Sequence, residues 1–95
     1  ATDSRIPPYE KNVYQGPHEW DVVFRAQGLA VELDGRPYHV ALQDMENDRA
    51  KDIWAQRRGL RIMRITDFAW DYGRDQAVRD LLALLALGGW TPSAA

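Results

Sequence analysis

The stretch WDVVFRAQGLAVELDG, residues 20–35, decides the fold that the sequence predicts. Apolar residues recur at every second position over residues 20–25 and again over residues 29–34, which is typical of strands with one buried face. Gln27 and Gly28 lie between the two segments, and a two-residue turn there would use glycine for its positive φ. The sequence therefore predicts an antiparallel hairpin.

The predicted turn also sets the pairing of the two strands. It places Ala26 opposite Leu29 and, further along, Asp21 opposite Asp34. The polar face then carries Asp21, Glu32 and Asp34, with Cβ separations of roughly 5–7 Å. Three close carboxylates repel one another unless a cation or a shared proton relieves them, and a hard divalent ion is the simplest explanation. A solvated sheet face without function is the alternative, and alternation alone favours it.

The residues that follow predict a helix and then a strand. Residues 43–58 are a charged helix with Met45, Ile53 and Trp54 as its apolar contacts, and Gly59 is a natural C-cap. Residues 60–66 have apolar side chains on both faces, as expected in a sheet that helices cover on both sides.

The last predicted element is a strongly apolar helix over residues 75–87. The whole order predicts an α/β fold, in which a mixed sheet (an antiparallel hairpin, then helix, strand and helix) is flanked by helices. Ninety-five residues are enough for one domain.

Three regions follow along the chain. Residues 1–19 contain three of the five prolines and are expected to be an extended arm, with one short strand near residues 13–15. Residues 20–90 are the core, and residues 91–95 should fray. We expect the chain to be the C-terminal domain of a longer protein.

Composition excludes several classes of site. The chain has no cysteine, so disulfides, thiolate zinc sites and cysteine nucleophiles are excluded. The net charge of −2 argues against nucleic-acid binding through global positive charge, although six basic residues between Arg49 and Arg64 could form a local patch. No apolar run is long enough for a membrane span, and residues 1–8 do not look like a signal peptide, so no membrane partner and a cytoplasmic location are expected.

Several residues in order match a known pattern. They are Asp21, the ELDG run at residues 32–35 followed by His39, the DRAKD run at residues 48–52, Gly59, and Met63-Arg64. This set resembles the endonuclease-like domains related to very-short-patch-repair endonucleases, in the PD-(D/E)XK nuclease superfamily, over roughly residues 6–87. The resemblance implies a restriction-endonuclease-like fold, a Mg²⁺ or Mn²⁺ cofactor, and DNA as the partner.

The resemblance also implies residue roles. Asp21 and Glu32 are the expected metal ligands, with the backbone carbonyl of Leu33 as a third, and His39 is the expected base or water-orienting group. Basic side chains near the site are expected to hold phosphates, and Gln43 is a further candidate beside the metal. The basic candidates are Arg49, Lys51 and Arg64.

Three of these candidates also have simpler interpretations. Gln43 is more simply an N-terminal helical residue without function. Arg49 and Lys51 are by default members of a salt-bridged helix surface. Arg64 is expected in a central strand, where it should pair with a carboxylate of the site or with phosphate.

One position departs from the superfamily pattern. Asp34 stands where a lysine is expected. Either Lys51 or an arginine has taken over the role of that lysine, or Asp34 is a catalytic residue that joins the metal shell.

The function predicted from these residues is that of a metal-dependent DNA endonuclease. A monomer has one site, so it should nick one strand or cut single strands with little sequence specificity, and an oligomer or a fusion to another domain stays open. One alternative is an inactive nuclease-like module that binds nucleic acid or protein. A glycosidase using the carboxylate pair is a second, but it needs an aromatic-lined cleft, and the tryptophans are expected mostly in the core.

Overall fold

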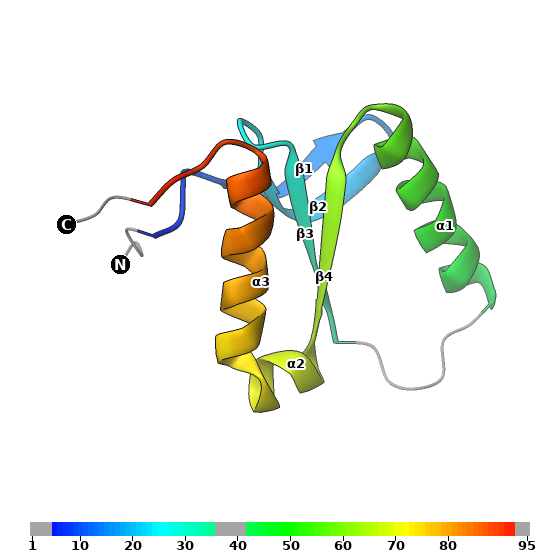
Figure 1. Cartoon of the computed structure of the whole chain (residues 1–95). Coiled ribbons are helices and arrows are strands. Elements are labelled where there is room, and N and C mark those ends of the chain that lie inside the picture. Colours follow the sequence, from blue (N-terminus) through cyan, green and yellow to red (C-terminus); the bar gives the residue numbers. More distant parts are fainter. Residues whose placement is uncertain (1–4, 36–41, 93–95) are drawn as a thin grey trace.

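The predicted hairpin forms the centre of a four-stranded mixed sheet (Figure 1). The computed structural model describes residues 5–35 and 42–92. Neighbouring strands are antiparallel from β1 to β3, and β3 and β4 are parallel. The elements in chain order are β1 (Glu10–Gln15), β2 (His18–Phe24), β3 (Leu29–Asp34), α1 (Leu42–Arg57), β4 (Arg61–Thr66), α2 (Asp67–Tyr72) and α3 (Arg74–Leu87).

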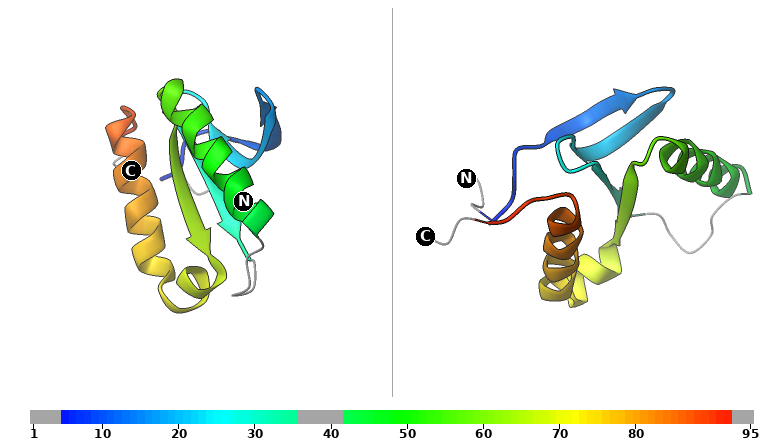
Figure 2. Two further views of the ribbon diagram at one scale, coloured as in Figure 1. Left: turned by 90° about the vertical axis from the view of Figure 1, so that its right-hand side faces the viewer. Right: turned by 45° about the horizontal axis from the view of Figure 1, so that its top comes forward.

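Helices cover both faces of the sheet, which confirms the predicted mixed α/β architecture. Figures 1 and 2 show α1 on one side of β3 and β4, and α3 on the other. Two apolar clusters follow from this arrangement. The cluster under α1 contains Trp20, Val23, Ala30 and Ala55. The cluster under α3 contains Phe24, Leu29, Val31, Ile65, Ala77 and Leu85.

The N-terminal strand is longer than predicted. β1 spans Glu10–Gln15 instead of residues 13–15, and it pairs with a β2 that begins at His18. Trp90 folds back against the cluster under α3, and its Nε1 donates a hydrogen bond to the carbonyl of Arg5 at 2.8 Å. The two ends of the described chain are therefore tied together.

The predicted hairpin register is wrong, although the predicted faces of β3 are right. Phe24 pairs with Leu29, so the loop contains the four residues 25–28 instead of the two expected. Tertiary contacts explain the wider loop, because the guanidinium of Arg61 donates to the carbonyl of Gln27 at 2.9 Å, and its backbone N–H donates to the carbonyl of Gly28 at 3.0 Å. Extending this register moves Asp21 from opposite Asp34 to opposite Glu32.

Trp20 lies on the other face from the one predicted. Simple alternation places it with Val22 and Phe24, yet it packs under α1 while they pack under α3. The pairing of β1 with β2 is interrupted between Trp20 and Val22, where Asn12 has a φ of 52° and the register places it opposite Asp21. The register is the same on both sides of this point, so no residue is inserted, and a local backbone distortion accompanies the change of face between Trp20 and Val22.

Two helices also differ from the prediction. α2 was not expected, although its N-cap is visible in the sequence, since Thr66 Oγ1 accepts a hydrogen bond from the N–H of Ala69 at 3.0 Å. In α1, Met45 and Ile53 are exposed, and Ala55 is the buried contact. Within the described ranges no helix combines the length and apolar character that crossing a membrane requires.

Replacing Gly16 with alanine is expected to destabilise the fold. A methyl group there would overlap the ring of Trp54, which contacts the rings of His18 and Trp20. Overpacking of this kind costs about 1–3 kcal/mol, which urea unfolding followed by tryptophan fluorescence would measure. Gly59→Ala is the matched control, because the φ of Gly59, +72°, is close to the +61° of Gly16, but no atom lies within 4 Å of a methyl group added there. If both variants lose the same free energy of unfolding, the loss in Gly16→Ala does not come from the contact with Trp54.

Candidate functional site

Helix α1 presents charged residues to the sheet. Asp48, Lys51, Asp52 and Ala55 recur at the spacing of one helical face. The first three are half-buried and Ala55 is fully buried. Most helices that cover a sheet turn an apolar stripe toward it. The charged stripe of α1, Asp48, Lys51 and Asp52, therefore marks the α1–sheet interface as a candidate site.

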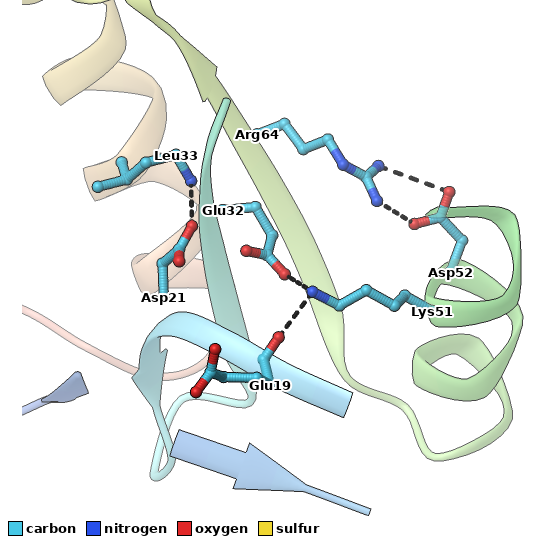
Figure 3. A network of polar contacts seen from close by, with 7 residues as sticks. All are labelled: Glu19, Asp21, Glu32, Leu33, Lys51, Asp52 and Arg64. Atoms are coloured by element: carbon cyan, nitrogen blue, oxygen red, sulfur yellow. Dashed lines mark hydrogen bonds and ion pairs between the residues drawn. The ribbon is translucent and has the colours of Figure 1, made fainter. Parts of the chain in front are cut away.

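Lys51 is the centre of this interface (Figure 3). Its Nζ forms an ion pair with Glu32 Oε1 of β3 and donates to the backbone carbonyl of Glu19 at 2.7 Å. The ammonium also lies 4.4 Å from the ring centre of Trp20, close enough for a cation–π contact. The side chains of Lys51 and Glu32 are only 18% and 13% exposed. This ion pair is thus largely shielded from solvent.

Asp21 and Glu32 come together across β2 and β3. Extending the observed register by one step places them opposite each other, and Asp21 Oδ2 accepts a hydrogen bond from the N–H of Leu33 at 2.7 Å. In an extended strand the N–H and C=O of one residue point toward the same neighbour, so the Leu33 carbonyl also points to the β2 side. Both predicted carboxylate ligands and the predicted carbonyl therefore lie in one region of the sheet.

The carboxyl group of Glu32 has a raised pKa. Burial is the largest cause, and Asp21 adds to it both as a hydrogen-bond partner and as a like charge. Lys51 acts in the opposite direction through its hydrogen bond and its positive charge. The pKa is raised on balance because Lys51 does not fully offset the burial of Glu32 together with the nearby Asp21.

A shallow pocket of about 220 Å³ opens beside the ion pair. Besides Leu33, its lining is entirely charged: Glu32, Asp34, Asp48, Lys51 and Arg64. Asp34 pairs in register with Thr66 of β4, one step beyond the pairing of Glu32 with Arg64. The pocket therefore follows the carboxyl-terminal ends of the two parallel strands.

Arg64 does not have the position that the sequence predicts. β4 is the last strand in the described sheet, so Arg64 lies on an edge strand instead of a central one. Its guanidinium forms an ion pair with Asp52 of α1 at 2.6 Å, and this hydrogen bond is the main cause that raises its pKa. Arg64 thus pairs with a helix carboxylate, although it also lines the pocket with Glu32 and Asp34.

Other predicted site residues lie apart from this pocket. Arg49 is exposed and does not line it. Gln43 is exposed, and its amide donates to Asn47 Oδ1 one helical turn away at 3.1 Å. His39 lies outside the described residues. Across residues 5–35 and 42–92, no group of three or more histidine, aspartate or glutamate side chains is close enough to hold a metal, so the predicted three-carboxylate cluster is not formed there.

Three acidic residues that the sequence analysis did not single out lie in or beside the site: Asp48 lines the pocket, Asp52 pairs with Arg64, and Asp67 lies near Gly35. Asp48 and Asp52 lie with Lys51 on one helical face, and the spacing of 48, 51, 52 and 55 was the signal available in the sequence. Asp67 begins α2, and its Oδ2 would lie 2.9 Å from a methyl group added to Gly35. The contact brings the start of α2 against the end of β3.

Comparison of the chain with protein-family models, with curated proteins and with solved structures finds no match. The resemblance to very-short-patch-repair-like domains therefore stays a prediction from the sequence.

The raised pKa of Glu32 predicts a pH-dependent stability. An acid whose pKa is higher in the folded state binds more protons folded than unfolded, so stability is lost as pH rises through the folded pKa. We expect wild type to lose free energy of unfolding, relative to Glu32→Gln, as the pH rises above the ordinary value of 4.5. Urea unfolding of both proteins in metal-free buffers from about pH 4 to pH 7 would measure this difference. A constant difference would show that the Glu32 carboxyl is not perturbed.

Proposed function

We propose that the chain is a metal-dependent endonuclease that hydrolyses phosphodiester bonds in DNA, with a restriction-endonuclease-like fold. One observation carries the proposal. Glu32 faces Asp21 across the hairpin and contacts Lys51 from α1 (Figure 3). Two carboxylates and a lysine are the charged groups that the PD-(D/E)XK pattern calls for, and here three separate elements supply them.

The topology supports the same proposal at a coarser level. An antiparallel hairpin is followed by a helix and a parallel strand, and the acids lie on the middle strands β2 and β3. This is the order that the resemblance implies.

The donor set is compatible with Mg²⁺ or Mn²⁺. Mg²⁺ usually takes one or two protein carboxylates and fills the remaining positions with water and substrate phosphate. Asp21 and Glu32 would supply the carboxylates, with the Leu33 carbonyl on the same side of the strand. When bound, the ion would activate water and neutralise charge that develops on the phosphate.

Lys51 would take the role of the lysine that Asp34 replaces in the sequence pattern. Its ammonium keeps Glu32 more readily ionised and places a fixed positive charge at the edge of the pocket. A charge held in place before the reaction is effective in stabilising a developing anion, because little reorganisation is needed. Asp34 then lines the pocket beside this pair. Arg64, which already bonds to Asp52, is suited to a neighbouring phosphate.

A second candidate function is a nuclease-like module that binds nucleic acid or protein without cleavage. The specific observation in its favour is that Lys51 already contacts Glu32, the carboxylate that the metal would need. Titration with Mn²⁺ followed by calorimetry separates the two candidates. A heat of Mn²⁺ binding that is present in wild type and absent in Glu32→Gln supports the nuclease. The absence of any metal-binding heat in wild type supports the module.

The test of the proposal is relaxation of supercoiled plasmid. We expect nicked circles with Mg²⁺ or Mn²⁺, none with excess EDTA, and recovery when metal is restored. A monomer has one site and cuts one strand, so we expect nicked plasmid and not linear plasmid. Wild-type protein that binds DNA but leaves it intact in both metals would contradict the proposal.

A further inference from the structure

Two aromatic rings are displayed on the outside of α2. Phe68 and Tyr72 are one helical turn apart, with ring centres 5.0 Å from each other and planes inclined by 39°. Their exposed fractions are 70% and 79%. Large apolar side chains that remain this exposed as a packed pair often mark a binding site.

The pair lies at the end of the sheet where the proposed site is found. β3 and β4 are parallel, so they finish at the same end, and α2 follows β4 directly (Figure 1). Asp67 lies against Gly35, the residue after Asp34. Leu33, between Glu32 and Asp34 in sequence, is itself 61% exposed. The aromatic pair therefore lies at the same end of the sheet as the charged pocket.

A second pocket lies under the two rings. It measures about 290 Å³, and its lining combines apolar residues with Arg64, Gln76 and Asp80. Arg64 also lines the charged pocket beside Glu32, but Met63 and Ile65 pack under α3 while the Arg64 guanidinium pairs with Asp52 of α1, so the two pockets lie on opposite faces of edge strand β4. The volume is near the lower limit of the ~300–1,000 Å³ typical of ligand sites, which suits a single planar ring system.

The mixed lining favours a nucleobase over an apolar peptide. A base offers a flat face for the rings of Phe68 and Tyr72 and polar edges for the amide of Gln76 and the carboxylate of Asp80. These two side chains are hydrogen-bonded to each other at 2.8 Å, and each still has capacity for further hydrogen bonds. A purely apolar occupant would cover Arg64, Gln76 and Asp80 without offering them partners.

We propose that Phe68 and Tyr72 stack an unpaired nucleobase at the end of the sheet that also carries the acidic pocket, so that the protein prefers single-stranded or frayed DNA to intact duplex. This inference rests on the proposed nuclease function and specifies the strand form of its substrate. Stacking on aromatic side chains accepts every base, because each base has a π face. The preference is thus for unpaired structure and not for sequence.

The test measures binding without cleavage. A fluorescein-labelled single-stranded oligonucleotide and its duplex are titrated with the whole chain in EDTA, and anisotropy is recorded. Phe68→Ala and Tyr72→Ala should each weaken single-strand binding by about fivefold or more, while duplex binding changes by less than about twofold. Single strands carrying 2-aminopurine should lose fluorescence with wild type, since stacking quenches it, and keep it with either alanine variant.

Matched variants make the result specific. Tyr72→Phe keeps the ring and should bind like wild type. Tyr14→Ala removes a tyrosine of similar exposure, 71%, from β1 and should also bind like wild type. The proposal is overturned if the alanine variants retain single-strand affinity, if they lose duplex affinity equally, or if wild type does not quench 2-aminopurine.

The binding titration and the plasmid-nicking assay together separate this inference from the proposed function. Glu32→Gln should lose nicking but retain single-strand preference and quenching. If wild type binds and quenches but never cleaves, the stacking site stands and the nuclease fails. If nicking depends on Glu32 but the α2 variants change nothing, the nuclease stands and the stacking site fails.

Discussion

Glu32→Gln is expected to slow plasmid nicking by at least about 10²-fold. The substitution keeps the size of the side chain and removes the charge that would bind the metal, and such an ion supplies several kcal/mol of transition-state stabilisation, at about 1.4 kcal/mol per factor of ten. Glutamine also leaves Lys51 without its ion-pair partner at a position where both side chains are largely shielded. The rate of conversion of supercoiled to nicked plasmid in Mg²⁺ measures the effect.

The control is Glu46→Gln, the same chemical change at an exposed position of α1. It should nick at the wild-type rate. Circular dichroism and urea unfolding must show that Glu32→Gln is folded at the assay temperature. Wild-type activity in folded Glu32→Gln would place the reaction elsewhere and refute the assignment of this site.

Lys51→Met is the second substitution with a large expected effect. Methionine keeps an aliphatic side chain near the Trp20 ring but removes the ammonium, so nicking should fall by about 10²–10³-fold if Lys51 stabilises developing charge. Lys51 also lowers the pKa of Glu32. Its loss should keep Glu32 protonated to higher pH, so the acidic limb of the pH–rate profile should shift to higher pH.

A stability change should accompany the loss of Lys51. Removing one partner of a fully buried ion pair costs about 3–5 kcal/mol, and this pair is partly accessible, so about 1–3 kcal/mol is expected from urea unfolding. Lys11 is the only other lysine of the chain and is exposed on β1, so Lys11→Met is the matched control. An unchanged acidic limb in Lys51→Met would mean that Lys51 does not control the ionisation of Glu32.

Local patterns were sufficient for β2, β3, α1, β4 and α3, but not for α2 or for the length of β1. Alternation over residues 20–34 predicted two antiparallel strands, and apolar residues on both faces of residues 60–66 predicted helices on both sides of the sheet. Gly59 follows the predicted helix end, and its φ of +72° is what a C-cap glycine provides. These features depend on neighbours a few residues away, and such neighbours are visible in a sequence.

The register was beyond local reasoning. The two-residue turn at Gln27-Gly28 satisfies turn preferences, but Arg61 bonds to the carbonyls of both residues from a strand more than thirty positions later. Those contacts favour the wider loop. The change brings Asp21 opposite Glu32 instead of Asp34, so the arrangement of the acids was decided by a distant arginine.

The sequence by itself determined which charged residues lie on the strands, and thus that Glu32 and Asp34 share one face of β3. It left open which residue takes the role of the lysine expected at Asp34. Only the tertiary structure brought Lys51 to Glu32, because that ion pair depends on which face of α1 turns toward the sheet. Helical spacing shows that Asp48, Lys51 and Asp52 share a face, but it cannot show that this charged face is the inner one. Packing of Ala55 against Trp20 and Val23 decides that, and with it the proposed site.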